Sequence, residues 1–416
     1  MSGVFKKARR HRMRIAWFVW FFAAIFVLFQ FFLQLSSGVI IEAVMKSFAL
    51  SAFGGGFLMS SYYYVYVLLQ TPAGVLIDRY GPRWILGTGA VFVSMGCFLF
   101  ATAKIVVFAF IGRILMGTGA SFAFIGCMNV VSIWFPARRF AFMTAIVETA
   151  GMAGAISGNF WLAGVIHKIG WQRCLLAAAI FAAGLSFALF LFVRNAPGRK
   201  KNVKTPIFSA TFLSGLKKLI SNHLVWINGV YSGAMFSVVT VFIALWAIPF
   251  FKVAYHVNLW TASAVASALY VGIAVGGPFL GWLDSKTKWR RGLMIFNAFF
   301  AALCLGVVIA DTQLSLVLVM CLLFLTGVCA SSYVLTFAIA NEIAGPLYRA
   351  TSIGFTNMLC VAFAPLLQPL IGFLLTHTHH TAVGVYSVSQ FQWAVSIVPL
   401  FLVISGCLAL LLPSKQ

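Results

Sequence analysis

The sequence predicts an all-α, polytopic membrane protein with about twelve transmembrane helices in two six-helix pseudo-repeats. Its 416 residues are 62% hydrophobic and only 8% charged, whereas a soluble domain carries about 25% charged residues. Apolar stretches of about 20 residues, each long enough to cross the hydrocarbon core of a bilayer, recur from Ile15 to Leu412. This composition excludes a soluble fold and makes the lipid bilayer the expected environment.

The apolar stretches predict the spans in chain order. They cover residues 15–37, 53–77, 84–103, 106–134, 140–166, 173–194, 224–251, 259–283, 291–310, 313–341, 350–376 and 389–412. Residues 1–14 form a basic cytoplasmic arm before the first span, which lacks a small-residue cleavage site and is expected to remain as a helix. The most polar interval, 195–222, is the predicted cytoplasmic linker between a half at 15–194 and a half at 223–416.

The distribution of positive charge predicts the orientation. A formal net charge of +23 would suggest nucleic-acid binding in a soluble protein. In the predicted topology, however, nearly all basic residues fall on one side, and the other side holds only Lys46, Lys104, Lys168, Arg173 and Lys252. The positive-inside rule places both termini in the cytoplasm. Short loops favour a bacterial inner (plasma) membrane, and no nucleic-acid partner is expected.

The two halves carry a degenerate repeat. Asp78 follows the second span, and Asp284 follows the eighth span 206 positions later. Parallel repeats of this kind place a substrate cavity between the halves near the bilayer midplane, and one half rocks against the other during transport. No soluble domain, catalytic set or metal-ligand set is visible in the sequence, so neither enzymatic activity nor a cofactor or metal is expected.

The connection between the second and third spans carries the most specific motif. The stretch GVLIDRYGPR, which begins at Gly74, matches G-x-L-x-D-R-x-G-x-[RK] at every fixed position. Gly74 allows a close helix approach, and Gly81 permits a tight turn. Asp78 can form a charge cluster with Arg79 and Arg83 that latches one conformation, although Arg79 is also explained as a charge flanking a span. The motif resembles the signature loop of the major facilitator superfamily of secondary transporters.

A second copy of the motif departs from the family pattern. In GPFLGWLD, which ends at Asp284, the glycine precedes the aspartate by three positions instead of four, and Arg290 follows one position later than the family spacing. The resemblance implies a second-half gate formed by Asp284 and Arg290.

Two charged residues lie inside predicted spans, where a charge is expensive and is expected to face a cavity or a partner. Arg113 belongs to GRILMGTG in the fourth span, which is similar to the R-x-x-x-G-x-G stretch of the superfamily. The resemblance implies a role in proton coupling; the alternative is a snorkelling arginine near the outer end.

Glu148 lies in the fifth span, where desolvation favours the neutral carboxyl group, so it is the predicted proton carrier. Its alternative is a structural glutamate, and no direct pair with Arg113 is expected because the two lie at different depths.

Polar and amphipathic side chains inside the spans prefer the bundle interior. Those predicted to line the substrate cavity are Tyr63, Tyr66, Gln70, Trp246, Asn357 and Gln368. Helix packing explains each of them equally well. His377, His379 and His380 predict a solvated loop rather than a metal site, because no cysteine or carboxylate accompanies them.

Together these features predict a monomeric secondary active transporter that moves a small organic solute by alternating access. Proton-coupled uptake of an amino acid, an organic acid or a siderophore-like solute is the favoured mode, with the solute and protons as partners. A proton-driven efflux antiporter is the alternative, although the proline of the antiporter glycine motif is absent near Gly151, Gly154 and Gly158. A third interpretation is a receptor or assembly factor that has the fold without transport.

Overall fold

The computed structural model describes residues 2–136, 139–194, 217, 219–287, 289–377 and 386–412. Within these ranges it describes all side chains except those of residues 2–12, 71, 78, 140, 141, 145, 341 and 344–351. All regular structure in the described part of the chain is helical, which confirms the predicted all-α class.

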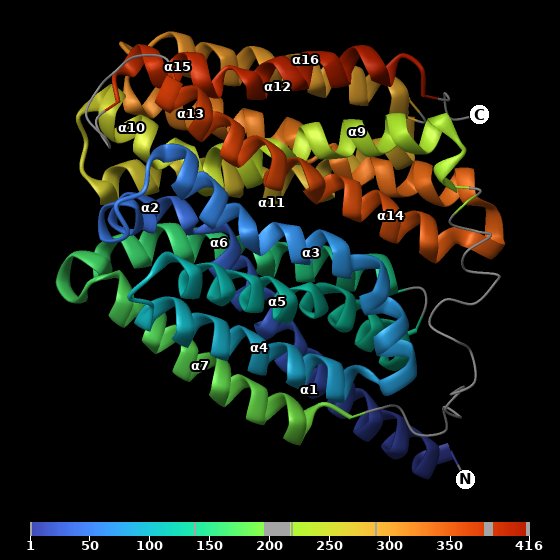
Figure 1. The fold of residues 1–416 in the computed structure, drawn as a ribbon. Coiled ribbons are helices and arrows are strands. Elements are labelled where there is room, and N and C mark those ends of the chain that lie inside the picture. Colours follow the sequence, from blue (N-terminus) through green and yellow to red (C-terminus); the bar gives the residue numbers. More distant parts are fainter. Residues whose placement is uncertain are drawn as a thin grey trace.

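The helices of the first half form one group and those of the second half form another beside it (Figure 1). The first group contains α1 (Ser2–Leu35), α2 (Ser37–Ser47), α3 (Ala52–Tyr80), α4 (Pro82–Thr102), α5 (Val106–Trp134), α6 (Phe140–Ile169) and α7 (Trp171–Phe192). The second contains α9 (His223–Ser237), a π-helical segment (Val238–Trp246), α10 (Ala247–Tyr255), α11 (Leu259–Thr287), α12 (Arg290–Ala310), α13 (Leu316–Ala330), α14 (Tyr333–His377), α15 (Val388–Val395) and α16 (Ile397–Ala409).

The membrane spans match the predicted count. Ten segments of the described chain are long and apolar enough to cross a membrane. Helices α3 and α6, with 29 and 30 residues, are as long as these spans and complete the twelve. The predicted division into two halves with a linker stays a prediction, since most of the interval 195–222 lies outside the described residues.

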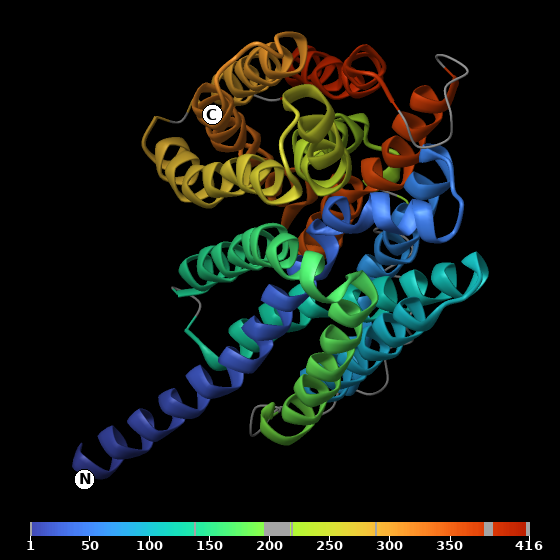
Figure 2. The same ribbon diagram turned by 90° about the vertical axis from the view of Figure 1, so that its left-hand side faces the viewer.

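The first span differs from its prediction at both ends. Helix α1 begins at Ser2, so the predicted basic arm continues the first helix, which projects beyond the bundle in Figure 2. At the other end the chain bends at Ser36 and continues as α2 to Ser47. The Ser36 hydroxyl donates to the Phe32 carbonyl (2.5 Å), a side-chain bond of the kind that bends helices.

The connection predicted at residues 342–349 is helical instead of a loop. All 45 residues of α14 have helical backbone geometry, so no loop separates its two ends. The Ser352 hydroxyl nevertheless donates to the Ala340 carbonyl at 2.8 Å, whereas residues twelve apart in a straight helix are about 18 Å apart. The helix therefore folds back sharply, and the segments Leu316–Ala340 and Ser352–His377 cross the membrane separately.

The seventh span contains nine residues of π-helix between α9 and α10. A π-helix displaces backbone carbonyls from their usual partners, and such segments are frequent at functional sites. Here the side-chain amide of Gln368, from α14, donates to the Thr240 carbonyl (2.7 Å). The irregular segment is thus held by a neighbouring helix.

Candidate transport site

Several contacts between the two halves lie at one end of the bundle, on the left of Figure 1. We call it the closed end; it carries residues 36–51 between α1 and α3 and residues 256–258 between α10 and α11. Glu42 forms an ion pair with Lys252 across the halves. The Ala52 amide donates to the Tyr386 hydroxyl (3.1 Å), and the rings of Phe160 and Trp260 lie 4.9 Å apart.

Backbones of the two halves also meet directly at this end. A Cβ added to Gly56 of α3 would lie 2.7 Å from the carbonyl oxygen of Gln368 in α14. One added to Gly38 of α2 would lie 3.0 Å from the carbonyl oxygen of Leu245 in the π-helical segment. Only glycine permits these approaches without displacing a helix.

Farther from the closed end, side chains from α3 meet α14. The Tyr64 hydroxyl donates to the Pro365 carbonyl (3.2 Å), and the Asn357 amide donates to Gln70 Oε1 (3.0 Å). Tyr66 contacts Gln70 from the same helix. The structure therefore brings together three residues predicted to line the cavity.

The other three predicted cavity residues form a second group. The Trp246 indole nitrogen donates to the Gln368 carbonyl (3.2 Å), and Tyr63 contacts the Gln368 side chain. All three side chains are buried. Their neighbours Asn159 and Tyr270 contact each other across the halves and were not singled out in the sequence, because neither stands in a motif.

Several buried polar atoms around these groups have no hydrogen-bond partner among the described residues. They are Gln30 Oε1, Gln70 Nε2, both amide atoms of Asn159, Thr356 Oγ1 and Gln368 Oε1. Buried polar groups in folded proteins are almost always satisfied, by protein, water or ligand. The contact zone between the halves therefore contains buried donors and acceptors that water or a ligand could satisfy.

Glu148 of α6 projects toward the other half. Its carboxyl group is close enough to Tyr66 of α3 and to Tyr333 and Cys360 of α14 to interact with them electrostatically. The ion pairs among described residues do not include it. A carboxyl group so placed has no fixed cation to hold it ionised, so it can exchange a proton with a solution that reaches the interface.

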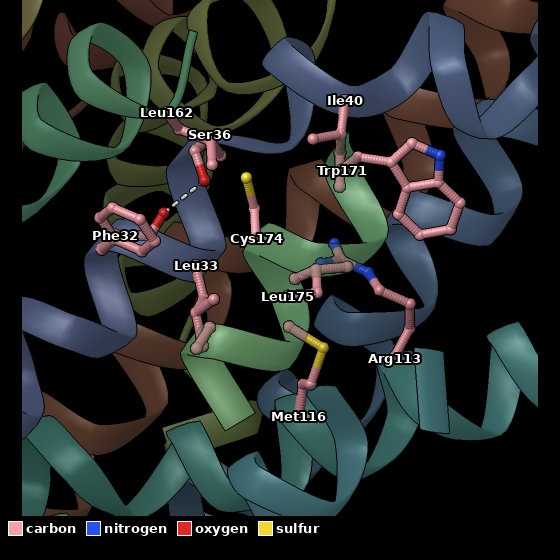
Figure 3. Close-up of a pocket in the computed structure, with 11 residues that line it drawn as sticks. Phe32, Leu33, Ser36, Ile40, Arg113, Met116, Leu162, Trp171, Cys174 and Leu175 are labelled. Carbon is pink, nitrogen blue, oxygen red and sulfur yellow. Dashed lines mark hydrogen bonds between the residues drawn. The ribbon is translucent and has the colours of Figure 1, made fainter. Parts of the chain in front are cut away.

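Arg113 of α5 is buried inside the first half, with 1% of its surface exposed. Its guanidinium donates to the Met59 carbonyl (2.7 Å) and the Ser37 hydroxyl (3.2 Å), and it lies 5.2 Å from the centre of the Tyr62 ring. It forms no ion pair with Glu148, as expected from their depths. Beside it lies a cavity of ≈ 20 Å³ (Figure 3). The alternative of a snorkelling arginine is wrong for this structure, because the charged group is enclosed.

The signature loop has the predicted tight turn. Helix α3 ends at Tyr80 and α4 begins at Pro82, with Gly81 between them at φ 85° and ψ 157°. Arg83 Nε donates to the Phe190 carbonyl (2.6 Å) and so ties α4 to the end of α7.

The predicted latch of this loop is described only in part. The guanidinium of Arg79 lies over the ring of the adjacent Tyr80, and the side chain of Asp78 lies outside the described residues. The close approach expected at Gly74 is absent, since no described atom lies within 4 Å of an added Cβ.

The second-half gate residues are in direct contact. Arg290 Nη2 lies 3.0 Å from Asp284 Oδ2, and Arg290 Nη1 lies 2.8 Å from both carboxylate oxygens of Glu342. Arg290 and Asp284 are buried. Glu342, which the sequence analysis did not assign, reaches this site because α14 returns to the ends of α11 and α12.

Comparison with known proteins decides the family. The model of the Major Facilitator Superfamily matches residues 19–369. The chain belongs to the major facilitator superfamily. It is a multi-pass membrane transporter and not an enzyme.

Relatives and solved structures of the superfamily are similar over most of the chain. An uncharacterized transporter of Bacillus subtilis (strain 168), YybO, is 24% identical over 79% of this chain and 80% of its own. A probable L-galactonate transporter of Escherichia coli (strain K12) is 23% identical over 81% of this chain and 78% of its own. The crystal structure of a bacterial homologue of the human lysosomal transporter Spinster, in an inward-facing and occupied conformation, has the same fold, with a TM-score of 0.73, 14% identity and coverage of 94% and 96%.

Proposed function

We propose that the protein is a proton-coupled carrier that takes up a small organic anion across the bacterial inner membrane. The carboxyl group of Glu148 carries the proposal, because it lies at the interface between the halves without a cationic partner among the described residues. Protonation would neutralise it before the halves rearrange, and deprotonation would release the proton on the other side. The alternating movement would rock the half at 15–194 against the half at 223–416.

An organic anion is the favoured substrate class for two reasons. The relative from Escherichia coli is named as a probable transporter of L-galactonate, a hydroxylated carboxylate. In this chain the unsatisfied amide and hydroxyl atoms around the contacts between the halves suit a substrate with several hydroxyl groups.

With both termini in the cytoplasm, as the distribution of basic residues predicts, the closed end faces the periplasm. Asp78, Arg79 and Arg83 in the first half and Asp284, Arg290 and Glu342 in the second would be gate elements of the cytoplasmic end.

Proton movement in proteoliposomes tests the proposal. The protein is reconstituted with a trapped pH dye, and pools of hydroxylated organic acids, amino acids, sugars and iron chelates are added outside. The organic-acid pool is expected to acidify the lumen with wild type and with Asp311→Asn, which removes a carboxylate at an exposed helix end, but not with Glu148→Gln.

Other results would overturn parts of the proposal. Solute accumulation without proton movement contradicts coupling through Glu148. Alkalinisation of the lumen by an added solute indicates the antiporter. If no pool changes the pH of the lumen and no solute accumulates, a receptor or assembly factor is favoured.

A further inference from the structure

Arg113 is a buried cation whose charge no described carboxylate neutralises. The described carboxyl groups lie in ion pairs, at the interface between the halves or on an exposed helix end: Glu42, Glu148, Asp284, Asp311 and Glu342. Asp78 belongs to the opposite end of α3, about 28 Å along the helix from the Met59 carbonyl that Arg113 contacts. A buried charge without a counter-charge is strongly unfavourable, so an anion from solution is the natural partner.

The cavity beside Arg113 has the properties of a small anion site. Its volume of ≈ 20 Å³ holds about one water-sized species. Figure 3 shows the guanidinium directed into it, near Trp171, Cys174 and Leu175. Arg113 Nε is buried without a hydrogen-bond partner. The site thus combines a fixed positive charge with an unused N–H donor.

We propose that this cavity binds a small monovalent inorganic anion of the chloride type, held by the guanidinium of Arg113. The cavity volume admits a halide and excludes an organic acid. The site lies within the first half, where the lining comes from α1, α2, α5, α6 and α7. The anion is therefore a structural counter-ion that stabilises the packing of these helices, and it is separate from the transported solute.

Thermal unfolding of the purified protein tests the site directly. The Tm is recorded while chloride replaces methanesulfonate, whose anion is too large for the cavity, at constant ionic strength. Wild type is expected to show a saturable rise of about 2 °C with chloride and with bromide. Arg113→Gln is expected to lose this rise. Arg173→Gln, which removes an exposed positive charge from α7 near the same end, is expected to keep it.

A second variant guards against loss of folding in Arg113→Gln. Cys174→Leu fills the cavity and leaves the guanidinium in place, so its Tm is expected not to respond to chloride. The proposal is overturned if chloride does not raise the Tm of wild type, or if it raises the Tm of wild type and of both cavity variants equally. Competition between L-galactonate and chloride for the same Tm shift would also overturn it, since Arg113 would then belong to the substrate site. If the proposal of proton-coupled transport fails, the expected rise of the Tm with chloride stays the same, so the two proposals are tested separately.

Discussion

The backbone contact at Gly56 predicts that a single methyl group opens the closed end. An alanine Cβ there would lie 2.7 Å from the Gln368 carbonyl oxygen and 3.2 Å from the Pro369 Cα. Ordinary contact begins at 3.4 Å, and because both neighbours are backbone atoms, α3 and α14 must separate. Overpacking of this kind costs about 1–3 kcal/mol. The cost falls only on the conformation in which the halves meet, so Gly56→Ala should shift the equilibrium about 5- to 150-fold toward opening at this end.

Distances between spin labels measure this shift. Ser47 at the end of α2 and Asn258 before α11 are exposed on opposite halves, so labels at Ser47→Cys and Asn258→Cys report the separation of the closed end. Cys321 and Cys407, which are exposed, are replaced by serine in this background. Gly56→Ala is expected to populate a longer distance. Gly354→Ala on α14, where nothing lies within 4 Å of the added Cβ, should not. An unchanged distribution in Gly56→Ala would refute the reasoning that this contact holds the end closed.

Three further substitutions probe other contacts. Arg290→Met removes one ion-pair partner of the buried Asp284 and should lower the free energy of unfolding by up to about 3 kcal/mol, with Arg290→Lys between it and wild type in Tm; an unchanged Tm would show that this ion pair contributes nothing to stability. Gly81→Ala places a side chain on a residue with φ 85° and ψ 157° and should lower the free energy of unfolding by about 1–3 kcal/mol. Its Tm should therefore be lower than that of Gly354→Ala, and equal Tm values would contradict strain at this turn. Asn357→Ala removes the donor to Gln70, a contact between α3 and α14, and should lower the free energy of unfolding by about 1 kcal/mol, seen as a Tm below that of wild type; an unchanged Tm would contradict a stabilising role for this contact.

Much of the fold follows from the sequence because each span must be apolar over the thickness of the bilayer. The fold-back in α14 could not be read in the same way. Gly345 and Pro346 are turn-forming residues that predict a loop, yet the backbone stays helical through them. The extension of the first span into α2 was missed because residues 37–47 mix apolar residues with Glu42 and Lys46.

For the site, sequence reasoning identified charged residues but not all of their partners. The motif spacing led to Asp284 and Arg290, which meet. Glu342 was missed because its contact depends on how α14 returns to the ends of α11 and α12. The hydrogen bond of Arg113 to the Met59 carbonyl was equally inaccessible, since a backbone acceptor has no sequence signature. The six residues expected at the cavity were chosen for polarity inside a span, and that criterion selected two groups of residues in mutual contact.

The most direct test of proton-coupled anion transport compares exchange with net uptake in the same vesicles. Labelled L-galactonate is offered to proteoliposomes that contain either unlabelled L-galactonate or no substrate and an inward proton gradient. Exchange needs no net proton movement, whereas accumulation does. The account predicts that Glu148→Gln keeps exchange and loses accumulation driven by the gradient. Accumulation by Glu148→Gln at the wild-type level would contradict the account, and loss of both activities would show that Glu148 serves the structure or the substrate instead of the proton.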